Sequence, residues 1–317
     1  MIIAAKLVVV TPVFEDAEAS GRLFQELRNE IGQDLFVVAV DDGSVKDPVS
    51  PSALDVAGLD GLVIRLKRNV GHQRAIAVGL SYVAENLPDA TCVVMDSDGE
   101  DLPSTIKELV APLATGEFDV VVARRKKRVE TLKFKLFYLV YRFLFKVMTG
   151  RRISFGNFMA FTPVAVARVA AMQELWIHVA ACVLVSKLRI SLCALDRGPR
   201  YAGQSKMNFV GLALHGFRAF MAFTEDVLVR VGIACVSIGV LSLVGIMISV
   251  VLKFNGMATP GWFSVALGVL ILVLLQTGTL TLMSLLLTGI VRSGIMLSVN
   301  YRDLIAQELP THAQAQH

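Results

Sequence analysis

A stretch of 65 residues near the C-terminus, 227–291, holds only two charged side chains, Arg230 and Lys253, and no acid. Its first part, 231–252, is long enough as a helix to cross a hydrocarbon layer of about 30 Å. A second apolar run, 262–291, follows a loop with turn-forming Asn-Gly and Pro-Gly pairs. The stretch predicts a transmembrane helical hairpin, with a buried hairpin of a soluble core as the weaker alternative.

The rest of the chain is polar enough to fold as a water-soluble domain. Hydrophobic residues make up 54% and charged residues 18% of the 317 residues. Because the 65 residues of the apolar stretch hold only two of the charged side chains, the low charge is concentrated there. We therefore expect a globular domain over 1–226, a hairpin segment over 227–292 and a tail over 293–317. Four cysteines without a CxxC pair predict neither a zinc site nor a redox motif.

Flanking charges predict the orientation of the hairpin. Arg230 and Arg292 flank its outer ends, whereas only Lys253 lies in the connecting loop. The positive-inside rule then places both ends in the cytoplasm. The apolar start of the chain is too short for a signal peptide, so we expect a multi-pass inner-membrane protein with a cytoplasmic domain.

A basic strip over 124–152 carries eleven Lys and Arg residues against one acid, Glu130, although the formal net charge of the chain is only +4. Aromatic residues within the strip recur at helical spacing, which predicts a basic amphipathic helix over about 132–148 on an anionic membrane surface. An ordinary core helix with a solvated face is the alternative, and the absence of a nucleic-acid motif argues against a nucleic-acid partner. We expect a second interfacial helix over about 208–226.

Strand-like and helix-like runs alternate through the first part of the chain, which is typical of an α/β fold with a mostly parallel sheet. Predicted strands cover 7–11, 35–40, 62–66, 91–95 and 118–123. Polar residues follow each strand, where open α/β sheets bind their ligands. Neither a GxGxxG fingerprint nor a P-loop is present in the sequence.

The sequence Asp96-Ser97-Asp98-Gly99-Glu100-Asp101 places four carboxylates within six residues, directly after an apolar strand. Such an oxygen-rich cluster suits Mg²⁺ or Mn²⁺ shared with substrate phosphates. Capping of the helix that begins near Pro103 is the structural alternative.

Taken together, the ordered motifs resemble those of the polyprenyl-phosphate glycosyltransferases of family 2, the group that includes dolichyl-phosphate mannose synthase and has the GT-A fold. The motifs are Val10-Thr11-Pro12-Val13-Phe14-Glu15, Val40-Asp41-Asp42-Gly43-Ser44, Arg68-Asn69-Val70-Gly71-His72-Gln73, Asp96-Ser97-Asp98, Arg124 and Gly203-Gln204-Ser205-Lys206. The resemblance implies a Rossmann-like GT-A sheet and a metal-dependent enzyme that binds a UDP- or GDP-linked sugar.

The resemblance also implies roles for individual residues. The positions that match the donor site are Pro12, Glu15, Asp42, Arg68, Asn69, Gln73, Asp96, Arg200, Ser205 and Lys206. The positions that match the metal ligands are Asp96, Asp98 and Glu100, the last of which is often Gln in relatives. The positions that match catalytic residues are Asp98, Arg124 and Arg128, and the two arginines face the acceptor phosphate. Glu15-Asp16 replaces the usual Asn-Glu, and the arginine of the polymer-synthase Gln-x-x-Arg-Trp motif is missing.

The predicted activity is transfer of one sugar, with inversion, from a nucleotide sugar to a polyprenyl phosphate such as undecaprenyl phosphate. A phosphate acceptor is already ionised at neutral pH, so no general base is required, and we expect His72 to cap its helix rather than act as a base. A family 2 enzyme with a glycan or protein acceptor, and a non-catalytic membrane protein that binds nucleotide sugars, are the alternatives. Association of copies through the hairpin is a further expectation.

Overall fold

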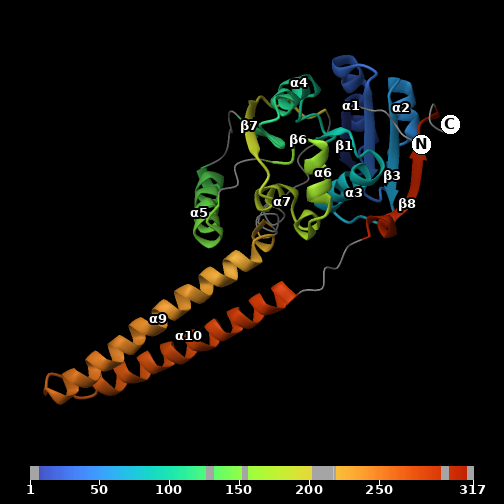
Figure 1. Cartoon of the computed structure of the whole chain (residues 1–317). Coiled ribbons are helices and arrows are strands. Elements are labelled where there is room, and N and C mark those ends of the chain that lie inside the picture. The colour runs from blue at the N-terminus through green and yellow to red at the C-terminus, as the bar shows by residue number, and fades with distance from the viewer. Residues whose placement is uncertain are drawn as a thin grey trace. The chain divides into compact units, whose positions relative to one another are not determined.

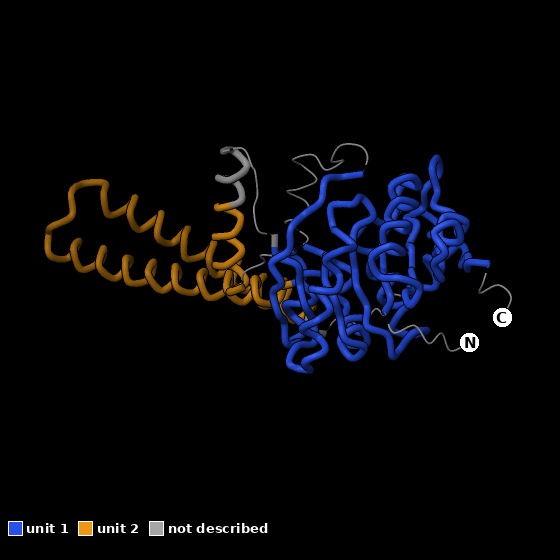
Figure 2. The backbone as a smooth tube through the Cα atoms, turned by 90° about the horizontal axis from the view of Figure 1, so that it is seen from above, with its two compact units in different colours: residues 1–135, 153–222, 297–317 blue, residues 136–152, 223–296 orange. Residues whose placement is uncertain are grey.

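The computed structural model describes residues 7–125, 132–151, 156–201, 217, 219–293 and 300–312. The chain divides into two compact units, drawn in different colours in Figure 2. The first unit comprises residues 1–135, 153–222 and 297–317, and the second comprises 136–152 and 223–296.

A single mixed sheet of eight strands lies at the centre of the first unit, in the order β7-β5-β6-β4-β1-β2-β3-β8 (Figure 1). The strands are β1 (Leu7–Val13), β2 (Leu35–Asp41), β3 (Asp60–Leu66), β4 (Thr91–Val94), β5 (Val120–Arg125), β6 (Met159–Phe161), β7 (Ile190–Leu195) and β8 (Ile305–Pro310). Strands β1 to β4 pair in parallel, as do β5 and β7, while β6 and β8 run antiparallel to their neighbours. The predicted α/β fold with a mostly parallel sheet is confirmed.

Helices cover both faces of this sheet (Figure 1). The helices of the first unit are α1 (Ala17–Ile31), α2 (Pro51–Ala57), α3 (His72–Asn86), α4 (Ile106–Val110), α6 (Pro163–Ala170) and α7 (Val179–Val185). The other helices, which lie wholly or mostly in the second unit, are α5 (Leu132–Thr149), α9 (Thr224–Phe254) and α10 (Trp262–Ser293). Single 3₁₀ turns occupy η1 (Pro103–Thr105), η2 (Ala111–Thr115), η3 (Gln173–Trp176) and η4 (Tyr301–Leu304).

The central strands are nearly continuous apolar runs because both of their faces are buried. Val8 belongs to a core that contains Ile76 of α3, and the next residue, Val9, belongs to a second core that contains Leu23 of α1. This alternation follows from the two-residue period of a strand. Helical cover on both faces is what a parallel sheet requires.

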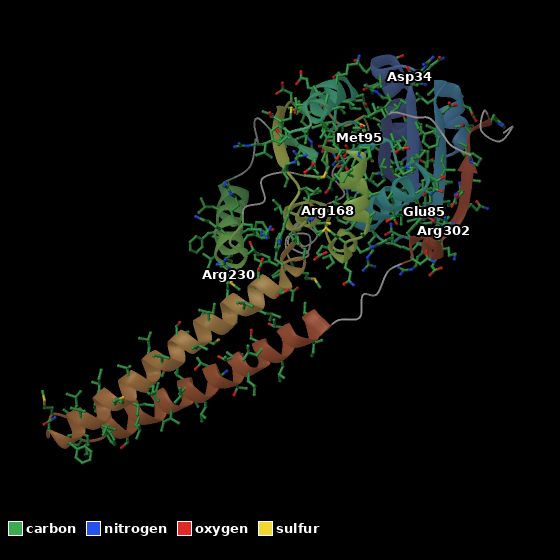
Figure 3. The ribbon with its side chains drawn as sticks, viewed as in Figure 1. Asp34, Glu85, Met95, Arg168, Arg230 and Arg302 are labelled. Atoms are coloured by element: carbon green, nitrogen blue, oxygen red, sulfur yellow. The ribbon has the colours of Figure 1, made fainter. Side chains whose placement is uncertain are left out.

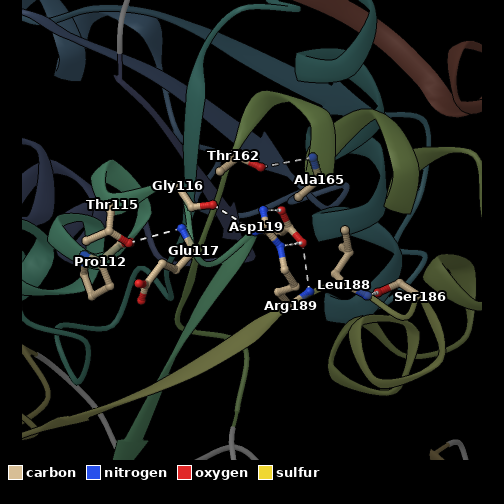
Figure 4. Close-up of polar contacts among 10 residues, drawn as sticks. All are labelled: Pro112, Thr115, Gly116, Glu117, Asp119, Thr162, Ala165, Ser186, Leu188 and Arg189. Atoms are coloured by element: carbon tan, nitrogen blue, oxygen red, sulfur yellow. Dashed lines mark hydrogen bonds and ion pairs between the residues drawn. The ribbon is translucent and has the colours of Figure 1, made fainter.

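Asp119 and Arg189 join the beginnings of β5 and β7 (Figure 4). Arg189 donates from Nη2 to Oδ1 of Asp119 at 2.7 Å and from its backbone N–H to Oδ2 at 2.8 Å. Strand β7 was not among the predicted strands, although five of its six residues are apolar; only Leu195 is fully buried. This ion pair lies at the end of the sheet opposite to the carboxyl ends of β5 and β7.

The C-terminal segment returns to the sheet as β8, which pairs antiparallel with β3. Arg302, just before β8, donates to Glu85 of α3 at 2.7 Å, and Figure 3 shows these two side chains next to each other. Tyr301 also donates to the Glu85 carboxylate. The segment expected as a plain tail therefore contains an edge strand of the sheet.

In the second unit, α9 and α10 pack as an antiparallel hairpin that buries small and polar side chains. Cys235, Ser242 and Ser249, each seven residues apart, are the buried residues of α9, and Thr277 and Ser284 are buried on α10. A seven-residue spacing keeps one helix face against its partner. Large apolar side chains such as Leu241, Ile248, Leu275 and Leu286 are exposed instead, the reverse of a water-soluble helix pair.

Both hairpin helices are long and apolar enough to cross a membrane, as predicted for 231–252 and 262–291. Helix α9 begins earlier than the predicted span, at Thr224. The predicted interfacial helix over 208–226 lies mostly outside the described residues.

Helix α5 matches the predicted amphipathic helix over 132–148, and its described part from residue 136 onward belongs to the second unit. Phe145 packs edge-on against Phe223 with ring centroids 5.5 Å apart, and Arg230 of α9 donates to the carbonyl of Val147 at 3.4 Å. Leu139 and Phe143 are about two-thirds exposed, at 66% and 65%. An exposed apolar face of this kind is typical of a helix that lies in a membrane surface.

Candidate active site

The acidic turn, Asp96–Asp101, follows β4 and is held by its own backbone. The N–H of Asp96 donates to Oδ2 of Asp101 at 3.0 Å, and the N–H of Glu100 donates to Oδ1 of Asp98 at 3.0 Å. Gly99 has a φ of 85°, which a residue with a Cβ adopts only with strain. The turn therefore has a defined shape at the carboxyl end of the parallel strands, where open α/β sheets bind ligands.

A segment that follows β7, residues 196–201, crosses the acidic turn, and we call it the arginine strap. The N–H of Gly198 donates to the carbonyl of Glu100 at 3.0 Å, and the N–H of Tyr201 donates to the carbonyl of Asp98 at 2.9 Å. A Cβ at Gly198 would lie 2.7 Å from a carbonyl oxygen of the turn, which is closer than real Cβ atoms approach. Direct contact between the two backbones therefore holds the arginine strap against the acidic turn.

Two arginines of the strap bind carboxylates of the turn. Nη2 of Arg200 lies 3.0 Å from Oδ2 of Asp98, and Nε of the same side chain lies 3.1 Å from Oε1 of Glu100. Arg197 binds the other carboxylate oxygen of Glu100. Burial and the neighbouring charge of Asp96 raise the pKa of Asp98, while Arg200 partly lowers it. Ionisation of Asp98 therefore depends on nearby positive charge.

Helix α1 holds the far end of the strap through Tyr201. The Tyr201 hydroxyl donates to Oε2 of Glu26 at 2.5 Å, and the guanidinium carbon of Arg22 lies 4.4 Å above the tyrosine ring. A Cβ on Gly99 would come within 2.7 Å of this ring. Glycine in the acidic turn therefore makes room for the tyrosine of the strap.

Asp42 joins the end of β2 to the loop after β3. Its carboxylate is buried and accepts hydrogen bonds from the N–H groups of Val70 at 2.7 Å and Gly71 at 2.9 Å. Burial raises the pKa of Asp42, although the two N–H groups oppose that rise. Next to it, a Cβ at Gly43 would lie 2.5 Å from the backbone of Arg68, so the two loops are in close contact.

Glu15 closes a loop rather than pointing into open space. Its carboxylate accepts from the N–H groups of Val45, Lys46 and Asp47, at 2.7–3.2 Å. These bonds, led by that of Val45, lower the pKa of Glu15. Its backbone has a φ of 48°, and Pro12 is buried in β1. The predicted contacts of Glu15 and Pro12 with a nucleotide remain predictions.

A chain of side-chain amides leads from α7 to the acidic turn. Gln73 is buried, accepts from the N–H of Val179 at 2.7 Å and donates to Oδ1 of Asn157 at 3.2 Å. Nδ2 of Asn157 lies 3.1 Å from Nε2 of His72, and that nitrogen lies 3.3 Å from Oδ1 of Asp96. Burial lowers the pKa of His72, but Asp96 and neighbouring carboxylates raise it more strongly. Gln73 and His72 thus connect α7 to the acidic turn. The N-cap of α3 is Gly71, without a side-chain cap hydrogen bond, so the structure does not show the capping role expected for His72.

A cleft opens beside the acidic turn, between the ends of β4, β5 and β7. Its lining contains Asp96 and Asp101 from the turn and Arg124 from β5, together with Asn157 and Arg197. Arg124 is exposed at the end of its strand. Carboxylates and guanidinium groups therefore line the same cleft, an arrangement that can bind a cation and a phosphate side by side.

The donor set of the turn fits a hard divalent cation in part. Asp96 and Asp98 offer carboxylate oxygens, but in the described ranges no three His, Cys, Asp or Glu side chains converge on one point. Two carboxylates suit Mg²⁺ or Mn²⁺ if phosphates and water supply the other ligands. Glu100 faces Arg197 and Arg200, so its assignment as a metal ligand remains a prediction.

The structure thus brings together Asp96, Asp98, Glu100, Arg124 and Arg200, while Arg68 and Asn69 lie exposed on the loop bound by Asp42. Arg128, Ser205 and Lys206 lie outside the described residues. Sequence reasoning missed Arg197, Tyr201 and Asn157. The polar run Asp196-Arg197-Gly198-Pro199-Arg200 after an apolar run was the available signal for Arg197.

The family model described as "Glycosyl transferase family 2" matches residues 8–176, more than half of the chain, and this range runs from the second residue of β1 through β6 and includes the acidic turn. The chain belongs to glycosyltransferase family 2. Its sheet is accordingly of the GT-A-like type, as predicted, and the family confirms that the protein is a transferase.

Relatives cover the chain to different extents. An uncharacterized glycosyltransferase of Synechocystis sp. is 25% identical over 280 residues, which is 84% of this chain and 85% of that protein. The undecaprenyl-phosphate 4-deoxy-4-formamido-L-arabinose transferase of Enterobacter sp. is 32% identical over 131 residues, which is 40% of this chain and 38% of the relative. A crystal structure described as a mycobacterial protein superimposes with a TM-score of 0.51 at 16% identity, covers 71% of this chain and 75% of its own, and shows the fold alone.

Proposed function

We propose that this family 2 enzyme transfers one sugar from a UDP- or GDP-linked donor to a polyprenyl phosphate such as undecaprenyl phosphate, with inversion. The observation that carries the proposal is the cleft in which Asp96 and Arg124 both lie, because it offers groups for a metal-bound diphosphate and for a second phosphate. The lipid acceptor is supported by the outward-facing apolar hairpin and by the Enterobacter relative, whose name states undecaprenyl phosphate.

On the donor side, Asp96 and Asp98 would hold Mg²⁺ or Mn²⁺, with Glu100 as a further candidate ligand. The bound cation would neutralise charge that develops on the diphosphate leaving group. Arg200, within the strap beside the turn, would bind a diphosphate oxygen, and the predicted loop residues Ser205 and Lys206 would add to it. Arg68, Asn69, Asp42, Pro12 and Glu15 would shape the nucleotide side of the site.

On the acceptor side, Arg124 and Arg128 would bind the lipid phosphate as planar forks. A phosphate monoester has a second pKa of about 6, so its oxygen is already a nucleophile at neutral pH. That oxygen would attack the anomeric carbon as the bond between this carbon and the diphosphate oxygen breaks. Attack opposite to the leaving group inverts the anomeric configuration, and no side chain has to remove a proton.

Membrane attachment completes the proposal. The α9–α10 hairpin would span an inner membrane, with Arg230 and Arg292 on the cytoplasmic side and Lys253 on the other. The exposed apolar face of α5 would lie in the cytoplasmic membrane surface, where phosphate headgroups are found. Exposed apolar side chains along α9 and α10 also provide a surface through which copies could associate.

The direct test is to incubate the full chain, purified in detergent, with undecaprenyl phosphate, Mn²⁺ and a panel of UDP- and GDP-sugars. Mass spectrometry of the lipid should reveal one added hexose-sized unit with one donor, and none with Asp98→Asn. Transfer to a glycan or protein but not to the lipid would overturn the acceptor, and binding without turnover of any donor would favour the non-catalytic alternative.

A further inference from the structure

Arg200 binds the carboxylate of Asp98, which the proposed function assigns to the divalent cation. Asp98 is engaged at both oxygens, since Oδ1 accepts the N–H of Glu100 and Oδ2 lies 3.0 Å from Arg200. The Arg200 side chain is only 30% exposed and that of Asp98 only 17%, so solvent screens this pair weakly. A cation that approached Asp98 would meet the positive charge of Arg200.

Glu100 gives Arg200 a second anchor. Arg200 binds Glu100 through Nε and Asp98 through Nη2, while Arg197 binds the remaining oxygen of Glu100. If Nη2 leaves Asp98, Nε can stay on Glu100, so the guanidinium group can turn without leaving the site. Glu100 is therefore a positioning residue for Arg200.

From this geometry we infer that Arg200 makes metal binding conditional on the donor. In the enzyme without donor, Arg200 neutralises Asp98 and weakens binding of the cation. When a nucleoside diphosphate arrives, its oxygens take over Nη2 of Arg200, Asp98 is released to the cation, and metal and nucleotide favour each other. This inference rests on the proposed function, because it assigns the metal to Asp98 and the diphosphate to Arg200.

The test is equilibrium binding of Mn²⁺ to the full chain in detergent, followed by electron paramagnetic resonance or calorimetry, with and without UDP or GDP. Wild-type protein should bind Mn²⁺ at least about fivefold more tightly when the matching nucleotide is present, within the usual range for coupled sites. Arg200→Gln should bind Mn²⁺ more tightly than wild type without nucleotide and should gain less from nucleotide than wild type does, because only the ligands that the diphosphate itself supplies remain.

Two control variants keep this result specific. Arg200→Lys retains the charge and should stay close to wild type in nucleotide-free Mn²⁺ binding. Arg168→Gln removes an exposed positive charge on α6, outside the site, and should change nothing. Circular dichroism and the melting temperature of each variant establish that it is folded.

Outcomes separate the two proposals. If Arg200→Gln is folded and binds Mn²⁺ no more tightly than wild type and Arg168→Gln, the competition is refuted, although sugar transfer by the wild type could still stand. Equal Mn²⁺ affinity of the wild type with and without nucleotide also overturns it. If no variant binds Mn²⁺ even with nucleotide, the metal assignment of the proposed function fails, and this inference fails with it.

Discussion

Asp42 accepts a hydrogen bond of 2.7 Å from the backbone N–H of Val70 and so ties the end of β2 to the loop that follows β3. The second carboxylate oxygen accepts from Gly71 at 2.9 Å, and the carboxylate is buried. An acid in this position therefore organises two loops of the candidate site, besides any contact that it makes with a nucleotide.

Asp42→Asn should destabilise the α/β domain. The amide NH₂ of Asn would replace one carboxylate oxygen and would face a backbone N–H, so that N–H would lose its hydrogen-bond acceptor. We expect a loss of about 1–3 kcal/mol, the usual cost of an unsatisfied buried donor. Thermal unfolding of the full chain in detergent measures it, with the exposed residue Asp34→Asn as the control. Unchanged melting of Asp42→Asn would show that the loop tie contributes nothing.

Arg124→Ala should weaken capture of the acceptor more than that of the donor. Loss of a charged hydrogen-bond donor to phosphate corresponds to about 10- to 100-fold in kcat/KM for undecaprenyl phosphate. The KM for the nucleotide sugar should change far less. Initial rates at varied lipid and donor concentrations separate the two effects, with Arg168→Ala as control. An equal effect on the KM of both substrates would contradict a specific role of Arg124 in binding the acceptor phosphate.

Glu100→Gln separates a positioning role from metal binding. Because Gln cannot pair with two guanidinium groups, Arg200 loses an anchor, and the KM for the donor should rise about tenfold while kcat changes little. Mn²⁺ affinity in the presence of nucleotide should fall no further than nucleotide affinity does. If Glu100 is instead a metal ligand, nucleotide-free Mn²⁺ binding by Glu100→Gln will be weaker than that of wild type.

Acid should release the C-terminal strand β8. Hydrogen bonds from Arg302, and then from Tyr301, hold the pKa of Glu85 below its ordinary value of 4.5. A carboxyl group with a lowered pKa in the folded state adds stability that is present above pH 4.5 and is lost as the pH falls through its folded value. The hydrogen-exchange protection factors of the amides of 305–309, which correct for the intrinsic pH dependence of exchange, should therefore fall below about pH 4.5 in wild type.

Glu85→Gln is the matched control for this pH dependence. Its β8 amides should exchange faster than those of wild type at neutral pH, and the acid-dependent step assigned to Glu85 should disappear. If the exchange of the β8 amides in Glu85→Gln depends on pH as it does in wild type, Glu85 is not the group whose protonation releases β8.

The orientation of the hairpin predicts which side of the membrane each loop faces. In intact cells, a membrane-impermeant maleimide should label Asn255→Cys, between α9 and α10, and should not label Asp89→Cys on the exposed surface of the α/β domain. Three native cysteines, Cys92, Cys182 and Cys235, are buried and give little background. Labelling of Asp89→Cys without permeabilisation would reverse the proposed topology.

Much of the architecture could be predicted because strands and helices follow from patterns of apolar and polar residues that are close in sequence. The predicted strand over 35–40 appears as β2 at Leu35–Asp41, and the apolar run from residue 262 appears as α10. Strand β6 has three residues and β8 six, and β8 is mostly exposed, so neither carries a long apolar run. Their pairing with β4, β5 and β3 depends on neighbours that are distant in sequence.

The candidate site shows the same division. Asp96 and Asp98 stand out because four carboxylates in one turn repel one another unless positive charge is near. The source of that charge could not be foreseen, since Arg197 and Arg200 belong to a segment about 100 residues later that reaches the turn only through the pairing of β7 with β5. Tyr201 and Glu26, 175 positions apart, meet for the same reason.

By itself, the sequence determined the apolar helical hairpin, the α/β class and the acidic turn, because composition, residue period and local charge act over a few neighbouring residues. Only the tertiary structure decided that Arg200 bridges Asp98 and Glu100, and that β8 covers the edge of β3. Such contacts are set by the order in which strands assemble into the sheet, and that order depends on the packing of the whole domain rather than on any local pattern.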